Sequence, residues 1–315
     1  MGFKIGIVGL PNAGKSTLFN LLTKKEVDID SYPFTTISPN LGIVEIPDKR
    51  MEEISGAILP EKKIYPILEF VDVAGLIEGA HKGEGLGNQF LSHLKGCRAL
   101  LQVIRDFGDN PSPEKDKKII ERELLLKDIE HLSSLEKKLR GEERVSLIKN
   151  LKEKAQEGTP LREIKLKEEE IESIKEFQFL TLKPISYLYN GKSYIDLKLE
   201  RELKDLSSKE KEELGITSRL DQLLLDCYNS FALITFFTIA NRKAQGWIIE
   251  RGKTILEAAE MVHSDFRDNF KRAEIVSLED LKEARSFEKS RSQGKVKTVG
   301  KDYQVKEGDI IEFKI

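Results

Sequence analysis

The sequence predicts an α/β fold: a doubly wound, largely parallel sheet that carries a helical insertion and is followed by a smaller α+β module. Three observations support this prediction. A phosphate-loop motif lies between an apolar run and a helix-compatible stretch. Strand-like and helix-like segments alternate over residues 1–110. Beyond them, a stretch dense in Lys and Glu shows helical periodicity, and the C-terminal region is β-rich.

The most specific signal is Gly9-Leu10-Pro11-Asn12-Ala13-Gly14-Lys15-Ser16, which fits the pattern G-x-x-x-x-G-K-S/T. It follows the apolar run Ile5–Val8 and precedes Thr17–Leu22, the strand–loop–helix order that a phosphate-binding loop requires. Glycines let backbone N–H groups surround the β-phosphate, the lysine reaches the β- and γ-phosphates, and the serine ligates Mg²⁺. The alternative is a chance turn with an isolated lysine. The expected nucleotide-binding residues are Asn12, Ala13, Gly14, Lys15, Ser16 and Thr17, with Lys15 also a catalytic candidate.

The sheet of the nucleotide-binding part is expected from short apolar runs separated by helix-like or loop segments. The candidate strands are Lys4–Val8, Leu41–Ile46, Ile67–Val71, Ala99–Ile104 and Pro184–Tyr189, with Tyr194–Leu197 as a shorter candidate. We therefore assign residues 1–110 and 180–228 to the nucleotide-binding domain.

The helical insertion is expected over residues 111–179. Apolar residues recur there at the spacing of one helical face, with a break at Gly141 and another at Gly158-Thr159-Pro160. The residues of this stripe are Leu125, Ile129, Leu132, Leu135, Leu139, Ile148, Leu151 and Ala155. The pattern predicts two antiparallel helices in a coiled-coil-like hairpin. Such a pair is either a solvated arm or a lever that binds a partner.

The C-terminal module is expected over residues 229–315. Its candidate strands are Ala232–Ile239, Trp247–Ile249, Ala273–Val276 and Ile310–Phe313, and its candidate helices are Thr254–Val262 and Leu278–Arg285. The mixture of short strands and two helices predicts a compact α+β unit.

Composition limits the class of protein. Of the 315 residues 34% are charged, yet the formal net charge is only −2, so global charge does not predict nucleic-acid binding. Cys97 and Cys227 lack metal-ligand spacing and are expected to be buried thiols in a reducing compartment. No signal peptide opens the chain, and no apolar run approaches the ~18 residues of a membrane span. We expect a cytoplasmic protein that does not bind membranes.

Two further motifs are expected to sense the nucleotide. Asp72-Val73-Ala74-Gly75 follows an apolar run and fits the D-x-x-G pattern, in which the aspartate holds Mg²⁺, usually through water, and the glycine N–H contacts the γ-phosphate. Upstream, Thr36 is the first choice and Thr35 the second for the hydroxyl that joins the Mg²⁺ shell. The metal candidates are thus Ser16, Thr36 and Asp72, and Gly75 is a catalytic candidate.

These motifs carry a family resemblance. Ser31–Asn40 (SYPFTTISPN) and Phe70–Asn88 (FVDVAGLIEGAHKGEGLGN) resemble the Obg-like ATPases, the YchF group of the translation-factor-related GTPases. The C-terminal module resembles the TGS domain of that group in Ala244–Gly252, His263–Phe266 and Gly300–Tyr303. The resemblance covers most of the chain in the same order. It implies a GTPase-like P-loop NTPase fold with a coiled-coil insertion and a C-terminal α+β TGS domain.

The resemblance also bears on hydrolysis. Many switch GTPases carry a water-orienting Gln after D-x-x-G, but Leu76 stands there in this chain, as in the family. In related enzymes an Asn at the position of Asn12 coordinates K⁺, so K⁺ is a candidate second cation here; the alternative is an Asn that stabilises the loop. His81 is a further catalytic candidate that could approach the γ-phosphate, and the alternative is a plain loop residue.

Base selection departs from the family pattern. Obg-like ATPases carry N-x-x-E where typical GTPases carry N-K-x-D, but the segment here is Asn190-Gly191-Lys192-Ser193. Asn190 and Gly191 are the expected residues on the base side. Ser193 replaces the acid, and a neutral hydroxyl serves either base and strongly rejects neither. The stretch that follows is shorter than in the family by roughly a helix. The resemblance implies ATP as substrate, and these residues predict relaxed use of ATP and GTP.

The leading hypothesis is a slow, Mg²⁺-dependent NTPase that regulates translation on the ribosome, with the large subunit as the expected contact. The alternative is a nucleotide-gated ribosome- or RNA-binding module with negligible turnover. A metabolic kinase is disfavoured because no acceptor-binding module is apparent. An RNA contact through the TGS-like module is suggested by a run of basic residues, Arg285, Lys289, Arg291, Lys295, Lys297 and Lys301.

Overall fold

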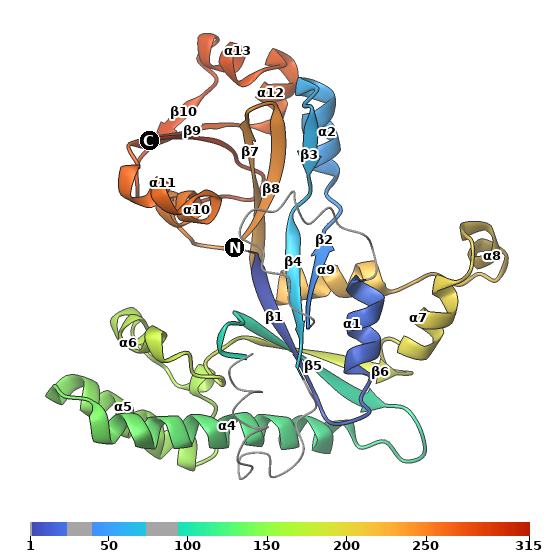
Figure 1. The fold of residues 1–315 in the computed structure, drawn as a ribbon, viewed down its shortest axis with the longest axis vertical. Coiled ribbons are helices and arrows are strands. Elements are labelled where there is room, and N and C mark those ends of the chain that lie inside the picture. Colours follow the sequence, from blue (N-terminus) through green and yellow to red (C-terminus); the bar gives the residue numbers. More distant parts are fainter. Residues whose placement is uncertain (1, 24–39, 74–93) are drawn as a thin grey trace.

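The computed structural model describes residues 2–23, 40–73 and 94–315 (Figure 1). The predictions for Thr35, Thr36, Gly75, Leu76 and His81 lie outside these residues. The described chain forms two sheets, one in the nucleotide-binding part and one in the C-terminal part, and a helical arm projects beside the first sheet (Figure 1).

Within the described residues the nucleotide-binding sheet has five strands in the order β2-β4-β1-β5-β6. Strand β2 is antiparallel to β4, and the other neighbours are parallel, as the sequence predicts for a largely parallel sheet. The strands are β1 (Phe3–Val8), β2 (Leu41–Glu45), β4 (Ile67–Asp72), β5 (Ala99–Asp106) and β6 (Ile185–Gly191).

Helices cover both faces of this sheet, so the doubly wound prediction is confirmed. Residues Ile5 and Ile7 of β1 pack against helices α1, α7 and α9, whereas Val8 packs against Ile120 and Leu124 of helix α4 on the other face. The alternation follows from the two-residue period of a strand. The bounds are α1 (Lys15–Thr23), α4 (Pro113–Lys138), α7 (Leu197–Lys204), α8 (Ser208–Glu213) and α9 (Leu220–Ser230).

The short candidate strand Tyr194–Leu197 is wrong. Ile195 forms only an isolated bridge with Asn190, and α7 begins at Leu197. The reason is local, because the Asp196 side chain accepts hydrogen bonds from the N–H groups of Lys198 and Leu199 and thereby caps a helix.

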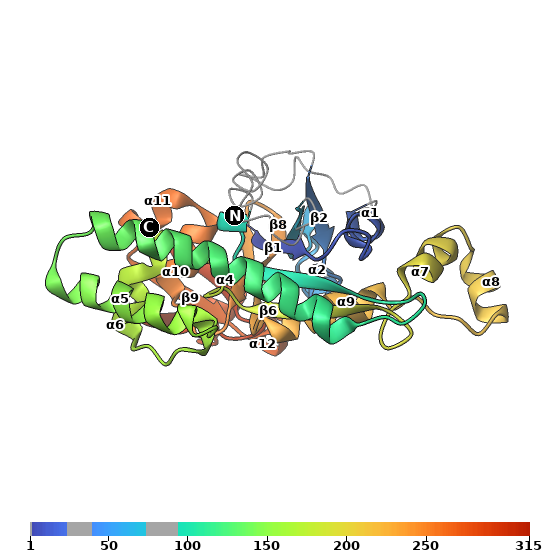
Figure 2. The same ribbon diagram turned by 90° about the horizontal axis from the view of Figure 1, so that it is seen from below.

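The predicted helical hairpin is present as α4 and α5 (Glu142–Gln156), which run side by side as the arm (Figure 2). Leu132 of α4 packs with Ile148 and Leu151 of α5 in a core separate from that of the sheet. Helix α4 is continuous from the sheet-facing Ile120 to Leu132, so the arm has no flexible joint at its root. The remaining arm elements are η3 (Leu161–Glu163), α6 (Glu168–Ile174) and η4 (Lys175–Phe177).

A buried carboxylate fixes the arm to the strand that enters the nucleotide site. Asp128 of α4 accepts hydrogen bonds from the backbone N–H groups of Leu180 (2.8 Å) and Thr181 (2.7 Å) and from the Thr181 hydroxyl (2.6 Å). Burial raises the pKa of Asp128, and these three donors oppose that shift. The segment held by Asp128 leads directly into β6, which carries Asn190.

The second sheet has six strands in the described part of the chain, in the order β10-β9-β11-β7-β8-β3. Four predicted strands of the C-terminal module are confirmed as β7 (Leu233–Ala240), β8 (Lys243–Glu250), β9 (Arg272–Val276) and β11 (Ile310–Lys314), and β10 (Lys297–Val299) is added. The two predicted helices are α10 (Ile255–Val262) and α12 (Leu278–Ala284), and the sequence did not indicate α11 (Ser264–Asn269) or α13 (Phe287–Ser292).

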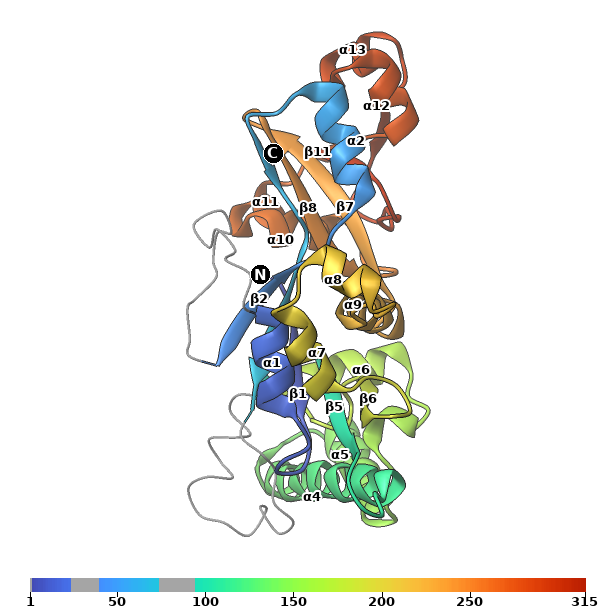
Figure 3. The same ribbon diagram turned by 90° about the vertical axis from the view of Figure 1, so that its right-hand side faces the viewer.

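The sixth strand, β3 (Lys62–Ile64), comes from the N-terminal part of the chain. Together with α2 (Lys49–Ile58) it lies beside the C-terminal strands and α12, as Figure 3 shows. We expected residues 1–110 to belong wholly to the nucleotide-binding domain, whereas the segment 47–66 packs with the C-terminal sheet. The physical reason is the apolar face of α2, since Met51 and Ile54 are fully buried against residues of that sheet.

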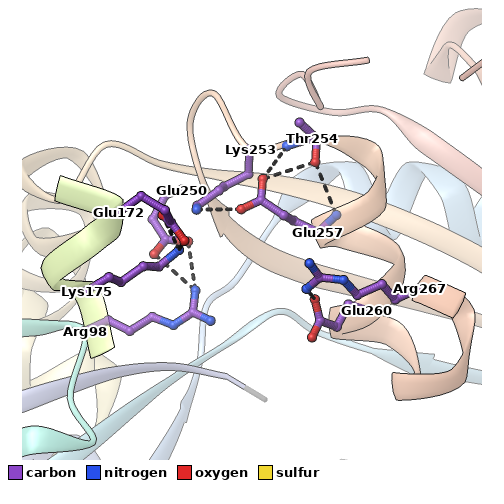
Figure 4. A network of polar contacts seen from close by, with 9 residues as sticks. All are labelled: Arg98, Glu172, Lys175, Glu250, Lys253, Thr254, Glu257, Glu260 and Arg267. Carbon is purple, nitrogen blue, oxygen red and sulfur yellow. Dashed lines mark hydrogen bonds and ion pairs between the residues drawn. The ribbon is translucent and has the colours of Figure 1, made fainter. Parts of the chain in front are cut away.

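An ion pair crosses between the two sheets (Figure 4). Arg98, directly before β5, pairs with Glu250 at the end of β8, with 2.9 Å between Nη1 and Oε2. Beyond β8, Thr254 and Glu257 form a capping box that starts α10.

No helix in the described part of the chain combines the length and apolar character that crossing a membrane requires.

Candidate nucleotide-binding site

The phosphate loop joins β1 to α1 at the carboxyl edge of the sheet. Gly9 and Gly14 have φ angles of 154° and 106°, which side-chain-bearing residues rarely adopt. A Cβ on Gly9 would lie 2.5 Å from the Val103 carbonyl oxygen, and a Cβ on Gly14 would lie 2.5 Å from Nδ2 of Asn190. Asn12 has a φ of 63°, a left-handed conformation that Asn tolerates better than most residues. The glycines are thus required by close packing on two sides of the loop.

Lys15 lies buried at the start of α1, and its Nζ donates a hydrogen bond to the Leu10 carbonyl oxygen at 2.8 Å. Burial lowers the pKa of Lys15 below its ordinary value of 10.5, and the nearby Asp72 carboxylate opposes that shift. The first turn of α1 carries no acidic side chain that would compete with an anion for the helix N-terminus. The ammonium group is therefore folded back over the loop, within which a phosphate would be bound.

The proposed metal ligands Ser16 and Asp72 come from neighbouring elements. Asp72 ends β4 and is the register partner of Ile7 in β1, and Ser16 is exposed in the first turn of α1. The Oδ1 atom of Asp72 is buried, and no hydrogen-bond partner for it exists among the described residues. A buried carboxylate oxygen without a partner is costly. This oxygen and the Ser16 hydroxyl are hard ligands of the kind that Mg²⁺ prefers, so the residues present fit the ion.

Asn190 connects the phosphate loop to the next helix. Its Nδ2 donates to the Ala13 carbonyl oxygen at 2.8 Å, and its Oδ1 accepts from the Leu197 N–H at 3.0 Å. The side chain is buried, so both bonds are shielded from water. The structure thus brings Asn190 into contact with the phosphate loop, although the two lie 177 residues apart in the chain.

Gly191 is the last residue of β6. Its φ is 148°, and a Cβ there would lie 2.0 Å from the Asp106 carbonyl oxygen. Its N–H donates to the Ile195 carbonyl oxygen at 2.7 Å, which closes the loop. Gly191 is therefore a site where two strand ends approach too closely for a side chain.

Asp106 is a residue of this site that the sequence analysis missed. Its Oδ2 accepts a hydrogen bond from the Ser193 N–H at 3.1 Å, and Asp106 is the register partner of Gly191. The available signal was its position, because a polar residue that ends a parallel strand lies at the same edge as the phosphate loop. Position 193 carries a serine instead of an acid, but the Asp106 carboxylate on the adjacent strand β5 lies next to it.

The basic run of the C-terminal module is partly neutralised. Arg291 pairs with Glu274 (2.5 Å) and Glu312 (2.6 Å), and Lys295 pairs with Glu283 and Asp280. The Lys297 ammonium lies over the Tyr303 ring, 5.3 Å from its centroid. The ion pairs of Arg291 and Lys295 offset part of the positive charge that the sequence alone suggests for this surface.

The fold and the site define a P-loop nucleotide-binding protein of the GTPase-like class. The family model described as "50S ribosome-binding GTPase" matches residues 4–150. The model YchF-GTPase_C, described as "Protein of unknown function (DUF933)", matches residues 233–315.

Full-length relatives agree with both models. A protein of Buchnera aphidicola subsp. Schizaphis graminum (strain Sg) named "Ribosome-binding ATPase YchF" is 38% identical over 99% of this chain and 99% of its own length. A protein of the same name from Bacillus subtilis (strain 168) is 35% identical over 100% of this chain and 99% of its own length. The solved YchF GTPase of Schizosaccharomyces pombe superimposes with a TM-score of 0.80 at 30% identity, covering 99% of this chain and 98% of that one. The chain belongs to the YchF family.

Proposed function

We propose that this chain is a Mg²⁺-dependent nucleoside triphosphatase that binds ribosomes and hydrolyses ATP, with GTP as a second substrate. The observation that carries the proposal is the phosphate loop, to which Asn190 is hydrogen-bonded, together with the buried Asp72 oxygen, which has no hydrogen-bond partner in the part of the chain that the structure describes. The names of the YchF relatives, which describe them as ribosome-binding ATPases, support the choice of ATP and of the ribosome. Ribosome binding would place the protein in the cytoplasm.

The residues are assigned roles by their chemistry. Asn12, Ala13, Gly14, Ser16 and Thr17 would surround the phosphates, and Lys15 would leave the Leu10 carbonyl to contact the β- and γ-phosphates. Ser16, Thr36 and Asp72 would hold Mg²⁺, which supplies charge neutralisation at the phosphate oxygens when bound. We keep Gly75 and His81 as candidates at the γ-phosphate.

Relaxed use of ATP and GTP is proposed for the base. Both polar atoms of the Asn190 side chain are hydrogen-bonded, one to the Ala13 carbonyl oxygen and one to the Leu197 N–H. We propose that these bonds position the backbone around the base rather than contact the base itself. Ser193 offers a neutral hydroxyl instead of an acid. Calorimetric titration with MgATP and MgGTP would decide between the two bases, and discrimination beyond about tenfold, or 1.4 kcal/mol, would refute relaxed binding.

K⁺ is proposed as the second cation, with the exposed Asn12 as its ligand. The ion would supply positive charge near the phosphates in place of part of an arginine finger. Phosphate release in KCl is expected to exceed that in NaCl, and Asn12→Ala should abolish the difference. Equal rates of the unmodified chain in the two salts would contradict this assignment.

Hydrolysis itself is tested by multiple-turnover phosphate release from MgATP and MgGTP. Lys15→Ala should abolish release, because it removes the only proposed cationic side chain at the phosphates. Asn20→Ala, at an exposed position of the same helix, is the matched control and should leave the rate unchanged. Tight nucleotide binding without release would instead support the nucleotide-gated binding module.

Ribosome contact is proposed through the arm, residues 111–179, and the C-terminal module, residues 229–315, with which the segment 47–66 packs. The rest of residues 1–110 and residues 180–228 would form the nucleotide-binding domain. The large subunit is the expected partner, and an RNA contact would use residues of the basic run Arg285, Lys289, Arg291, Lys295, Lys297 and Lys301. Co-sedimentation with separated subunits at increasing salt tests both points, since phosphate contacts weaken steeply with salt. Binding that is insensitive to salt would favour a ribosomal protein as the contact.

A further inference from the structure

The segment 47–66 occupies a position that the proposed hydrolysis does not explain. It connects β2 to β4, and β4 ends at Asp72 in the proposed metal site. Yet its own elements, α2 and β3, are built into the C-terminal sheet, as Figure 3 shows. The chain thus leaves the nucleotide-binding sheet after β2, becomes part of the C-terminal sheet as α2 and β3, and returns to the first sheet as β4, which ends at Asp72.

The segment is anchored in the C-terminal sheet by a core as well as by surface pairs. Met51 and Ile54 of α2 are 0% exposed and pack with Phe237, Val276 and Leu281. Strand β3 pairs in parallel with β8, with Lys63 opposite Ala244. Burial of this kind is worth about 1.5–3 kcal/mol for each large side chain, so α2 and β3 will not separate from the sheet during nucleotide exchange.

Ion pairs and a backbone hydrogen bond tie the segment to the C-terminal module. Arg50 pairs with Glu307 at 2.5 Å near its start, and Lys282 of α12 pairs with Glu53 at 2.6 Å. At its end the Glu61 N–H donates to the Arg242 carbonyl oxygen at 2.8 Å. The segment therefore moves with the C-terminal module.

The return path to the nucleotide site is short and extended. Only Tyr65 and Pro66 separate β3 from β4. Pro66 fits tightly over Gly246 of β8, because a Cβ on Gly246 would lie 2.6 Å from the Pro66 Cδ atom. An extended chain spans about 3.3 Å per residue and has little slack, so a displacement of the C-terminal sheet, which carries β3 with it, is passed to β4 and to Asp72.

We propose that the segment 47–66 mechanically couples the nucleotide site to the C-terminal module, so that nucleotide binding alters the C-terminal sheet and changes in that sheet alter nucleotide affinity. The two effects must be equal in free energy, because coupling between two binding equilibria is reciprocal. This inference rests on the proposed nucleotide binding. It predicts that the module which would contact a partner reports the state of the nucleotide.

The first experiment is hydrogen exchange of the full-length chain with and without Mg²⁺ and a non-hydrolysable ATP analogue. Exchange is expected to slow in the phosphate loop, in residues 47–66 and in β8. Slowing in the phosphate loop with no change in the other two regions would overturn the coupling. No slowing in the phosphate loop would instead count against the proposed nucleotide binding.

The second experiment uses matched glycine substitutions. Gly246→Ala places a methyl group against Pro66, whereas Gly300→Ala, in the same module, places one in open space. Gly246→Ala is expected to weaken analogue binding at least fivefold, the lower end of typical coupling, although it lies outside the nucleotide-binding sheet. Gly300→Ala should leave binding unchanged. Unchanged affinity in folded Gly246→Ala would contradict the proposal, and if that variant does not fold, the exchange experiment decides.

Discussion

At the scale of single residues, Asn190 links the parts of the site most closely. Its buried side-chain amide donates a hydrogen bond to the Ala13 carbonyl oxygen and accepts one from the Leu197 N–H. Asn190→Ala leaves both backbone groups without partners, which costs about 1–3 kcal/mol for each buried group. Denaturant unfolding should show a loss in this range, and both ATP and GTP should bind more weakly.

Asn190→Asp keeps the size of the side chain but removes the donor of the bond to the Ala13 carbonyl oxygen. The carboxylate still accepts from the Leu197 N–H but faces the Ala13 carbonyl oxygen as a second acceptor. We expect this variant to be no better than Asn190→Ala in nucleotide affinity. A variant with unimpaired affinity would mean that the Ala13 bond does not organise the phosphate loop.

Lys15 makes nucleotide affinity dependent on pH. Burial lowers its pKa in the free protein below 10.5, whereas bound phosphates favour the charged form and raise the pKa again. The complex therefore holds a proton that the free site has lost, and affinity falls as pH rises through the free-site pKa. Titrations from pH 7 to 10.5 should show this decline, and Lys15→Met should flatten it. An affinity that stays constant up to pH 10.5 would contradict the assignment.

At the scale of elements, the arm depends on a histidine packed among aromatic rings. His131 of α4 lies 6.3 Å from the Phe177 ring and 5.3 Å from the Phe179 ring, centroid to centroid. Burial lowers the pKa of His131 below 6.5, with Lys95 and Lys138 acting in the same direction. The unfolded arm thus binds a proton at a higher pH than the folded arm does.

The free energy of unfolding of the arm should therefore fall as pH drops below 6.5 towards the folded-state pKa. Hydrogen exchange of α4 and α5 at pH 7.5 and 5.5, corrected for intrinsic rates, measures this change. His131→Gln removes the titration and is expected to make the two pH values agree. A pH effect of the same size in that variant would assign the effect to another group.

At the scale of the whole molecule, Glu307 joins the two sheets. It pairs with Arg50 of α2 at 2.5 Å and accepts from the Tyr228 hydroxyl of α9 at 3.0 Å and from the Thr235 N–H of β7. Helix α9 leads from the nucleotide-binding part directly into β7, so these bonds hold the joint around the covalent connection.

Glu307→Ala should lower the free energy of unfolding by about 1 kcal/mol, because Glu307 is exposed and ion pairs at exposed positions contribute little. Glu307→Gln keeps the acceptor oxygen and should lose less. Thermal unfolding of the two variants beside the unmodified chain measures both. Equal loss in the two variants would show that charge rather than hydrogen bonding holds the joint.

The site was predictable to the extent that it is local in sequence. The loop Gly9–Ser16 and the position of Asp72 at a strand end follow from motifs that are each contained in one short segment of the sequence. The contact of Asp106 with Ser193 required the register of β5 against β6, which no local pattern specifies. The contact of Asn190 with Ala13 likewise joins distant segments.

The nucleotide-binding sheet, the helical hairpin and the main strands of the C-terminal module could be predicted from the sequence, because periodicity and turn residues act over a few positions. The departure of α2 and β3 from the first sheet to complete the second became visible only in the folded chain. A three-residue strand such as Lys62–Ile64 carries no periodic signal, and its partner β8 begins at Lys243, far along the chain. Its place is fixed by burial of Met51 and Ile54 against that distant sheet, a free energy that arises only once the whole chain has folded.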